Sequence, residues 1–258
     1  MLLNWVRKDF KDDIDFILVH QKDGTPVWWH KRIFDAYSDL DYDYCWNKDT
    51  TENQRFDYIT EQMKIQATKC ANAIQKSITV FENAWQPIAE KLNAVYSVAF
   101  DNDCSGILND MKAEVGLNSI CPRNVQDYTF HIYHRFEPKL AMSTALHEIT
   151  HFVWFYFWQK HFKDSCDEYN SPNLKWLLSE IVVETIIRNS EIGKLTEYPK
   201  YIAYSYFYNM EINGELIFDT MKKLYIERKD IFDFMEKSFD WIKNNEAELR
   251  AKISAAEK

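Results

Sequence analysis

Between residues 55 and 96 the chain has one long stretch in which apolar side chains return at steps of three and four residues. That spacing places them on one face of an α-helix, so the segment predicts a long helix. Its apolar positions are Phe56, Ile59, Met63, Ala67, Cys70, Ile74, Ile78 and Phe81. Pro87 lies inside the stretch and predicts a break or kink, because proline has no backbone N–H to continue the helical hydrogen bonds.

The second half of the chain contains a strongly apolar segment that follows a β-like one. Residues 127–134 are rich in aromatic and β-branched side chains, which favours a strand. Pro138 suits the first turn of a helix, which we expect to run from about Lys139 to Phe162. A mostly polar loop follows at 163–173. Three further helices are expected at about 174–189, 216–228 and 231–253.

The N-terminal and central segments carry weaker patterns. Residues 14–30 predict a β-hairpin turning at Asp23-Gly24, because apolar runs flank a turn-forming pair. Residues 101–127 are expected to be irregular, with a short helix near 107–115. The whole pattern predicts an α+β, predominantly helical fold with one small sheet. We expect a single domain over residues 1–258, with residues 1–54 as a candidate N-terminal subdomain.

Composition narrows the class of protein. Hydrophobic residues make up 46% of the chain and aromatic residues 16%, which is enough apolar material for a core and excludes global disorder. With only 5 glycines and 6 prolines, the chain has too few turn-forming residues for an all-β sandwich or barrel. The formal net charge of −9 disfavours nucleic acid as a partner, because phosphate contacts need clustered cations.

The cysteines bear on the cellular location of the protein, and the apolar segment at residues 140–158 bears on whether the chain spans a membrane. Five widely spaced cysteines without a Cys-x-x-Cys pair do not form a disulfide framework, and they favour a reducing, cytoplasmic location. The N-terminus has no pattern of a signal peptide. Residues 140–158 contain no Lys, Arg or Asp but do contain His147, Glu148 and His151, which are costly in lipid. We therefore expect a buried helix rather than a membrane span.

The residues that carry chemistry are His147-Glu148-Ile149-Thr150-His151, an H-E-x-x-H pattern. Four helical residues turn through about 400°, so both histidines project from one face, one turn apart, and can share a metal ion. Chance alone gives such a match in roughly 1–2% of chains with this composition. The alternative is a histidine pair satisfied inside an aromatic core, which is disfavoured because three buried polar groups within five residues need several partners.

This pattern resembles that of the zinc metallopeptidases called zincins. The resemblance implies one Zn²⁺ ion bound by His147 and His151, and Glu148 as the general base that acts on the water at the metal. It also implies that the metal-binding helix lies behind a small sheet whose edge strand holds the substrate. By position, residues 127–134 are the best candidate for that strand. The resemblance covers about residues 128–190.

A catalytic zinc needs a third protein ligand. The metzincin pattern fails, because Trp154 and Phe157 stand where it has glycine and histidine. His161 lies ten residues past the second histidine, about 15 Å further along a continuous helix, and is too far away. The remaining option resembles the gluzincins, in which a glutamate from a following helix binds the metal. Glu180 and Glu184 are in such a helix.

The gluzincin pattern favours Glu180 as the ligand and Glu184 as the acid that orients a metal-binding histidine. The reverse assignment stays open, because helical spacing does not separate two glutamates one turn apart. The 29 residues between His151 and Glu180 exceed the thermolysin-like spacing, so no closer family follows. Zincins usually add a donor to the developing oxyanion, and the downstream candidates are Tyr198 and Tyr201, then Tyr204 and Arg188.

Two functions follow from these residues. The first is a zinc-dependent peptidase, which cleaves a peptide or protein substrate with Glu148 as general base. The second is a non-catalytic helical binding protein whose metal site is decayed or structural. A structural zinc needs a fourth protein ligand, and the nearest cysteines, Cys121 and Cys166, are poorly placed, which favours the peptidase. The apolar stripe of residues 231–253 is expected to pack on the protein's own core rather than to define an oligomer.

Overall fold

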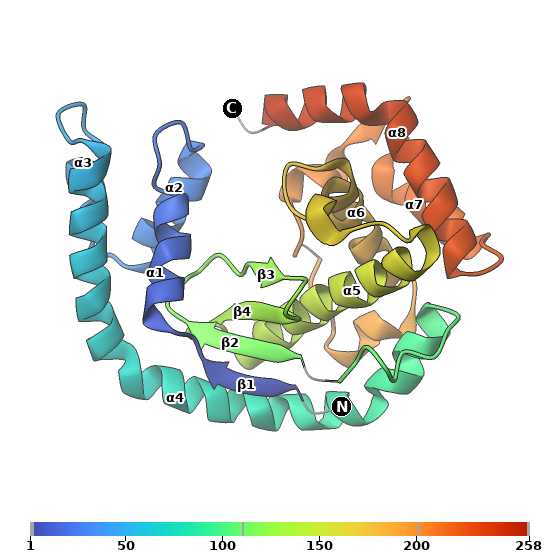
Figure 1. Ribbon diagram of the computed structural model, residues 1–258, viewed down its shortest axis with the longest axis horizontal. Coiled ribbons are helices and arrows are strands. Elements are labelled where there is room, and N and C mark those ends of the chain that lie inside the picture. The colour runs from blue at the N-terminus through green and yellow to red at the C-terminus, as the bar shows by residue number, and fades with distance from the viewer. Residues whose placement is uncertain (1–2, 110, 201, 257–258) are drawn as a thin grey trace.

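The computed structural model describes residues 3–109, 111–200 and 202–256. Its centre is a four-stranded sheet in the order β1-β2-β4-β3 (Figure 1). β1, β2 and β4 are parallel, and the short β3 pairs antiparallel with β4 at one edge. The strands are β1 (Asn4–Arg7), β2 (Lys112–Gly116), β3 (Arg123–Asn124) and β4 (Thr129–Tyr133).

The expected strand at residues 127–134 is confirmed as β4, but β2 replaces the helix expected near 107–115. In β2, the side chains of Ala113 and Val115 are buried while Lys112 and Glu114 face away, which is the two-residue alternation of a strand. β4 is also an inner strand of the sheet. The edge strands of this sheet are therefore β1 and β3, and not residues 127–134 as position alone suggested.

The expected hairpin at residues 14–30 is wrong, because two helices occupy this segment. Asp9 caps the first helix by accepting the amide N–H of Lys11. Gly24, with a φ of 84°, lies in the turn between the helices rather than in a hairpin. The two helices are α1 (Phe10–Val19) and α2 (Val27–Ala36). β1 belongs to the same sheet as β2, so the candidate subdomain at residues 1–54 is joined to the rest of the chain through strand pairing.

The predicted long helix is present as α4 (Glu52–Ala99), which follows the short α3 (Tyr42–Cys45). Thr51 and Gln54 close its N-terminus with a reciprocal capping box. Of the break or kink that we expected at Pro87, the break is absent, because α4 continues past this residue to Ala99. Both Pro87 and Asn83, whose carbonyl loses its helical donor, are exposed, so water can satisfy that carbonyl.

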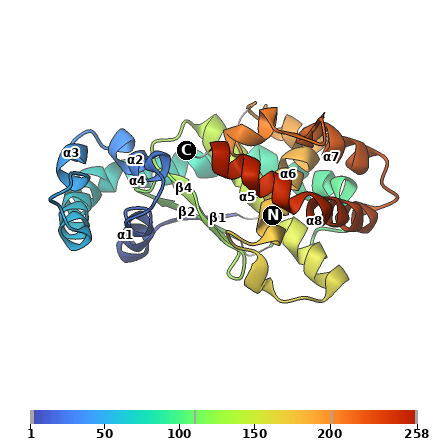
Figure 2. The ribbon, with the colours of Figure 1, turned by 90° about the horizontal axis from the view of Figure 1, so that it is seen from above.

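The four helices expected after residue 138 are confirmed with small shifts of their ends. Together with the small sheet, they make the fold predominantly helical. Figure 2 shows α1–α3 at one end of the molecule and α7 and α8 at the other, with the sheet between them. The helices are α5 (Pro138–Phe162), α6 (Leu174–Arg188), α7 (Ile217–Ile226) and α8 (Ile231–Ala256). Short 3-10 turns at 166–168, 191–195 and 205–209 and a two-stranded ribbon, β5 (Glu211–Ile212) with β6 (Glu215–Leu216), connect them.

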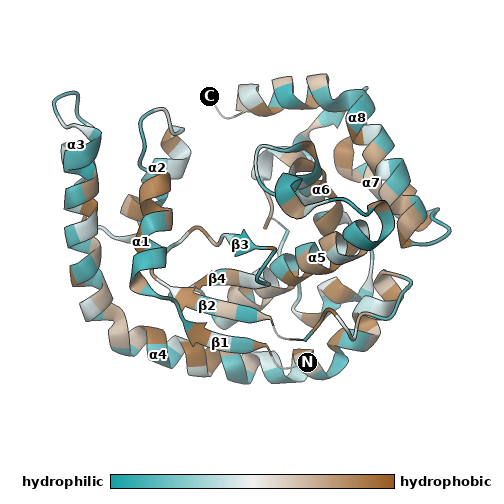
Figure 3. Cartoon of the chain, viewed as in Figure 1, coloured by the Kyte–Doolittle hydropathy of each residue, from teal (hydrophilic) through white to brown (hydrophobic). Residues whose placement is uncertain are grey.

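α5 crosses the centre of the molecule and packs against the sheet, α4 and α6. Every residue from Ala141 to Phe155 is buried, and Figure 3 shows apolar residues along much of this helix. The ring of Phe152 on α5 lies 6.1 Å from that of Phe130 on β4, which fixes the helix behind the sheet. Within the described ranges, the structure has no helix with both the length and the hydropathy to cross a membrane.

The hydroxyl of Tyr96 on α4 contacts α5, and its removal tests how much this contact contributes to the stability of the fold. Its hydroxyl is fully buried, donates to the carbonyl of Leu146 at 3.0 Å and lies 2.7 Å from Oγ1 of Thr150. We expect Tyr96→Phe to lower the free energy of unfolding by about 1–3 kcal/mol, because buried partners lose a hydrogen bond. Urea denaturation measures this change. Tyr44→Phe, at a 42% exposed residue, is the matched control, and equal stability of both variants would contradict the expectation.

Candidate metal centre

His147 and His151 meet on the face of α5 that looks toward α6. Their Nε2 atoms are 3.1 Å apart, and the residues are 4% and 0% exposed. This is the arrangement that the four-residue spacing predicted, with the two rings one helical turn apart. Two ligand atoms bound to one Zn²⁺ at 2.0–2.1 Å in tetrahedral geometry are about 3.3 Å apart, so this spacing suits a shared ion.

Glu180 on α6 supplies a third ligand atom at the same point. Its carboxylate oxygens lie 3.9 Å from Nε2 of His147 and 3.7 Å from Nε2 of His151. Ligand atoms of the three residues all lie within 4.8 Å of one another, and no other such group of His, Cys, Asp or Glu occurs in the described part of the chain. Neither Cys121 nor Cys166 joins the group, so the group offers three ligand atoms and no fourth among the described residues.

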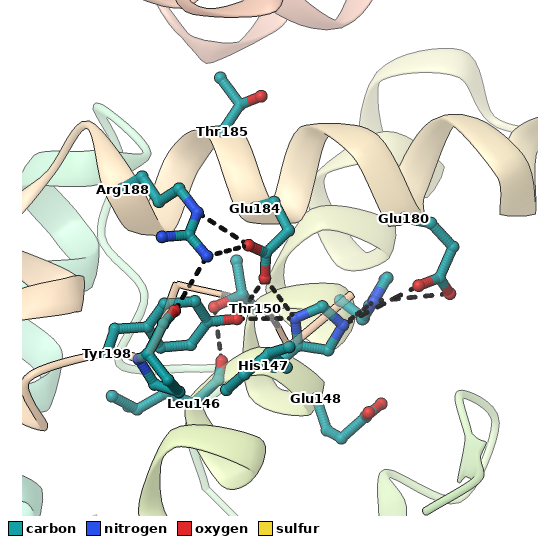
Figure 4. A network of polar contacts seen from close by, with 12 residues as sticks. Leu146, His147, Glu148, Thr150, Glu180, Glu184, Thr185, Arg188 and Tyr198 are labelled. Atoms are coloured by element: carbon teal, nitrogen blue, oxygen red, sulfur yellow. Dashed lines mark hydrogen bonds and ion pairs between the residues drawn. The ribbon is translucent and has the colours of Figure 1, made fainter. Parts of the chain in front are cut away.

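Glu184 lies one turn further along α6 and contacts the other nitrogen of His147 (Figure 4). Its Oε1 is 3.2 Å from Nδ1, and a carboxylate only accepts, so the contact places a proton on Nδ1 while Nε2 faces His151 and Glu180. Glu180 thus lies near the Nε2 atoms of both histidines, and Glu184 lies on the Nδ1 side of His147.

Glu184 is fully buried, and a set of donors holds it in place. Tyr208 donates to Oε2 at 2.7 Å, Arg188 donates from Nε at 2.9 Å, and the hydroxyl of Tyr198 donates to Oε1. Burial alone would raise the pKa of Glu184, but His147, Arg188 and Tyr198 outweigh it and lower that pKa to about 2. The carboxylate is therefore charged when it supports His147.

The surroundings of His147 favour positive charge. Burial by itself lowers the pKa of this imidazole, but the nearby Glu180 and Glu184 carboxylates raise it to about 10. His151 has its pKa lowered well below the usual value by burial and by the positive charges of Arg123 and His147. The two imidazoles of the group therefore differ, since carboxylates favour a proton on His147 and cations disfavour one on His151.

Glu148 points away from this group, as Figure 4 shows, and is 5% exposed. Burial is the largest cause that raises the pKa of its carboxyl, while Arg123 and His147 oppose the shift. A raised pKa makes a carboxylate a better proton acceptor near neutral pH. Glu148 lies outside the three ligand atoms, and Arg123 contacts both Glu148 and Glu180.

Arg123 is the residue at the site that sequence reasoning missed. It lies on the edge strand β3, and its Nη2 donates to Oε1 of Glu180 at 2.8 Å. Its Nη1 lies 3.4 Å from Oε2 of Glu148. Only its position shortly before a predicted strand could have pointed to it, and many other residues share that property.

The predicted oxyanion donors are spread around the site. Tyr198 lies on the Nδ1 side of His147, 3.0 Å from that nitrogen, which favours a supporting role over contact with substrate. Tyr201 lies outside the described residues. Arg188 is engaged by Glu184 and by the carbonyls of Pro199 and Lys200. Tyr204 packs against the ring of Trp176 on α6 and against Trp28 and Trp29 on α2.

His161 lies away from the metal group and pairs with Glu236 on α8 at 2.7 Å, in agreement with its exclusion as a ligand.

Comparisons of the chain with protein-family models, with curated proteins and with solved structures found no match.

Proposed function

We propose that this protein is a zinc-dependent hydrolase of zincin type, most specifically a peptidase. The observation that carries the proposal is the convergence of His147, His151 and Glu180 at one buried point, with Glu148 outside that group and linked to it by Arg123, which contacts both Glu148 and Glu180. Three protein ligands with an open position are typical of catalytic rather than structural zinc. The packing of the metal-binding helix behind a small sheet with a free edge strand also supports a zincin-like arrangement.

Each residue has a distinct role in the proposed reaction. A bound zinc ion supplies a water of lowered pKa and polarises the scissile carbonyl. Glu148 accepts the proton of the attacking water and delivers it to the leaving amine. Glu184 holds the proton on Nδ1 of His147 and so keeps Nε2 directed at the ligand group. Tyr198, Tyr208 and Arg188 keep Glu184 in place.

The competing function is a helical binding protein with a decayed or structural metal site. Such a site would require a fourth protein ligand or the loss of one of the three, and the described residues provide all three ligands and no fourth. The charged base beside the site is also unnecessary for a structural metal. These features favour the hydrolase.

Purified protein incubated with a diverse peptide library tests the proposal. We expect about one equivalent of zinc by elemental analysis, and cleavage that a chelator removes and added zinc restores. Mass spectrometry of the products reads the cleavage. Protein that binds zinc but cuts no peptide would support the binding function, and equal zinc in wild type and His147→Ala would overturn the metal site itself.

A further inference from the structure

Arg123 places a cation directly beside the group that we propose holds zinc. Its side chain is 11% exposed, and two of its nitrogens contact Glu180 and Glu148 while its buried Nε has no hydrogen-bond partner among the described residues. A guanidinium so close to a divalent cation is repelled by it. A role in supporting the metal therefore does not explain why Arg123 lies here. Arg188 differs, because it contacts Glu184 and not the three proposed ligands.

Arg123 also connects the metal group to a cleft. It lines a cleft of about 630 Å³ between α1 and the strands β2, β3 and β4, together with residues such as Asn124 and His131, whereas Glu180 and Glu148, which it contacts, do not line that cleft. Tyr198 and Arg188 contact the Nδ1 side of the His147–Glu184 pair instead. Among the predicted donors and the arginines placed at the site, Arg123 alone contacts the proposed base.

We propose that Arg123 stabilises the negative charge that develops on the carbonyl oxygen of the substrate. The inference rests on the proposed hydrolase function. When a cation takes the carboxylate of Glu180, the N–H that donates to Oε1 becomes available to a substrate oxygen. The electron pair of the carbonyl moves onto that oxygen as water adds, and the guanidinium stabilises it with charge-assisted hydrogen bonds without giving up a proton.

Arg123→Met and Arg123→Lys test this role, with Arg7→Met as the matched control at an exposed arginine on another strand. We expect Arg123→Met to lower kcat by about 100-fold or more with little change in KM, and Arg123→Lys to recover part of the loss. Zinc affinity of Arg123→Met should be unchanged or higher, because a repelling charge is gone. Weaker zinc binding would make Arg123 a positioning residue for Glu180 and overturn the proposal.

A binding measurement separates this inference from the peptidase assignment. Calorimetry of zinc-loaded protein with phenylphosphonate, a tetrahedral anion, should show about tenfold weaker binding to Arg123→Met than to wild type. Binding of acetohydroxamate, which has no tetrahedral oxyanion, should change less than about twofold. Equal effects on both probes, or no effect on either, overturn the role of Arg123. If wild type cleaves peptides and Arg123→Met cleaves them at the same rate, the proposed role of Arg123 is also overturned, but the hydrolase function is not.

Discussion

Glu148→Gln is expected to keep about one zinc per chain and to lose about 10²–10⁴-fold in hydrolysis, the usual contribution of a general base. Glutamine has nearly the same shape as glutamate but does not accept a proton from water. Because Glu148 lies outside the three ligand atoms, its loss should not release the metal. Zinc analysis and the initial rate of peptide cleavage, measured on the same preparation, check both parts.

Glu82→Gln, at an exposed position of α4, is the control for loss of a negative charge. Its rate should equal that of wild type. A Glu148→Gln protein that cleaves at the wild-type rate would remove Glu148 from the mechanism, and one that loses zinc would make it a ligand.

Glu180 and Glu184 are expected to differ sharply in their effect on the metal. Glu180→Ala removes a proposed ligand and should leave little bound zinc after dialysis. Glu184→Gln leaves the three proposed ligands in place and removes only the negative charge beside Nδ1, so it should weaken zinc binding about 10–100-fold, the usual effect of changing an outer partner of a metal-binding histidine. Competition with a chromogenic chelator measures both affinities.

The opposite order of effects would make Glu184 the ligand and Glu180 its support, the assignment that helical spacing alone left open. A folding control is needed, because Glu184 is fully buried and Arg188 would lose its partner. Far-UV circular dichroism and thermal unfolding of each variant without metal supply it. Equal zinc affinity in both variants and wild type would exclude either glutamate from the site.

The sequence predicted which side chains meet between α5 and α6 better than it predicted the sheet. His147, His151 and the pair Glu180 and Glu184 lie in long helices, where the 3.6-residue period fixes which side chains share a face. Which of the two glutamates lies nearer both Nε2 atoms does not follow from the sequence, because it depends on how far α6 is displaced along α5.

The missed elements are short and depend on distant partners. β3 spans only Arg123–Asn124, which is too short for any periodic signal, and it exists because it pairs with β4. No pattern in the sequence therefore identified Arg123 as a site residue. Residues 14–18 (Ile-Asp-Phe-Ile-Leu) have a composition that suits a strand, and the helix there is selected by the Asp9 cap and by the burial of Ile14 and Ile17.

The parallel pairing of β1 with β2 has a consequence for folding. Asn4 lies opposite Lys112, so β1 has no partner in β2 until about 100 further residues have left the ribosome. The intervening chain is mostly helical, with α4 the longest helix, and the local contacts of helices form fast. The edge of β1 therefore stays unpaired during this time, and the nascent chain is prone to aggregation until β2 pairs with β1.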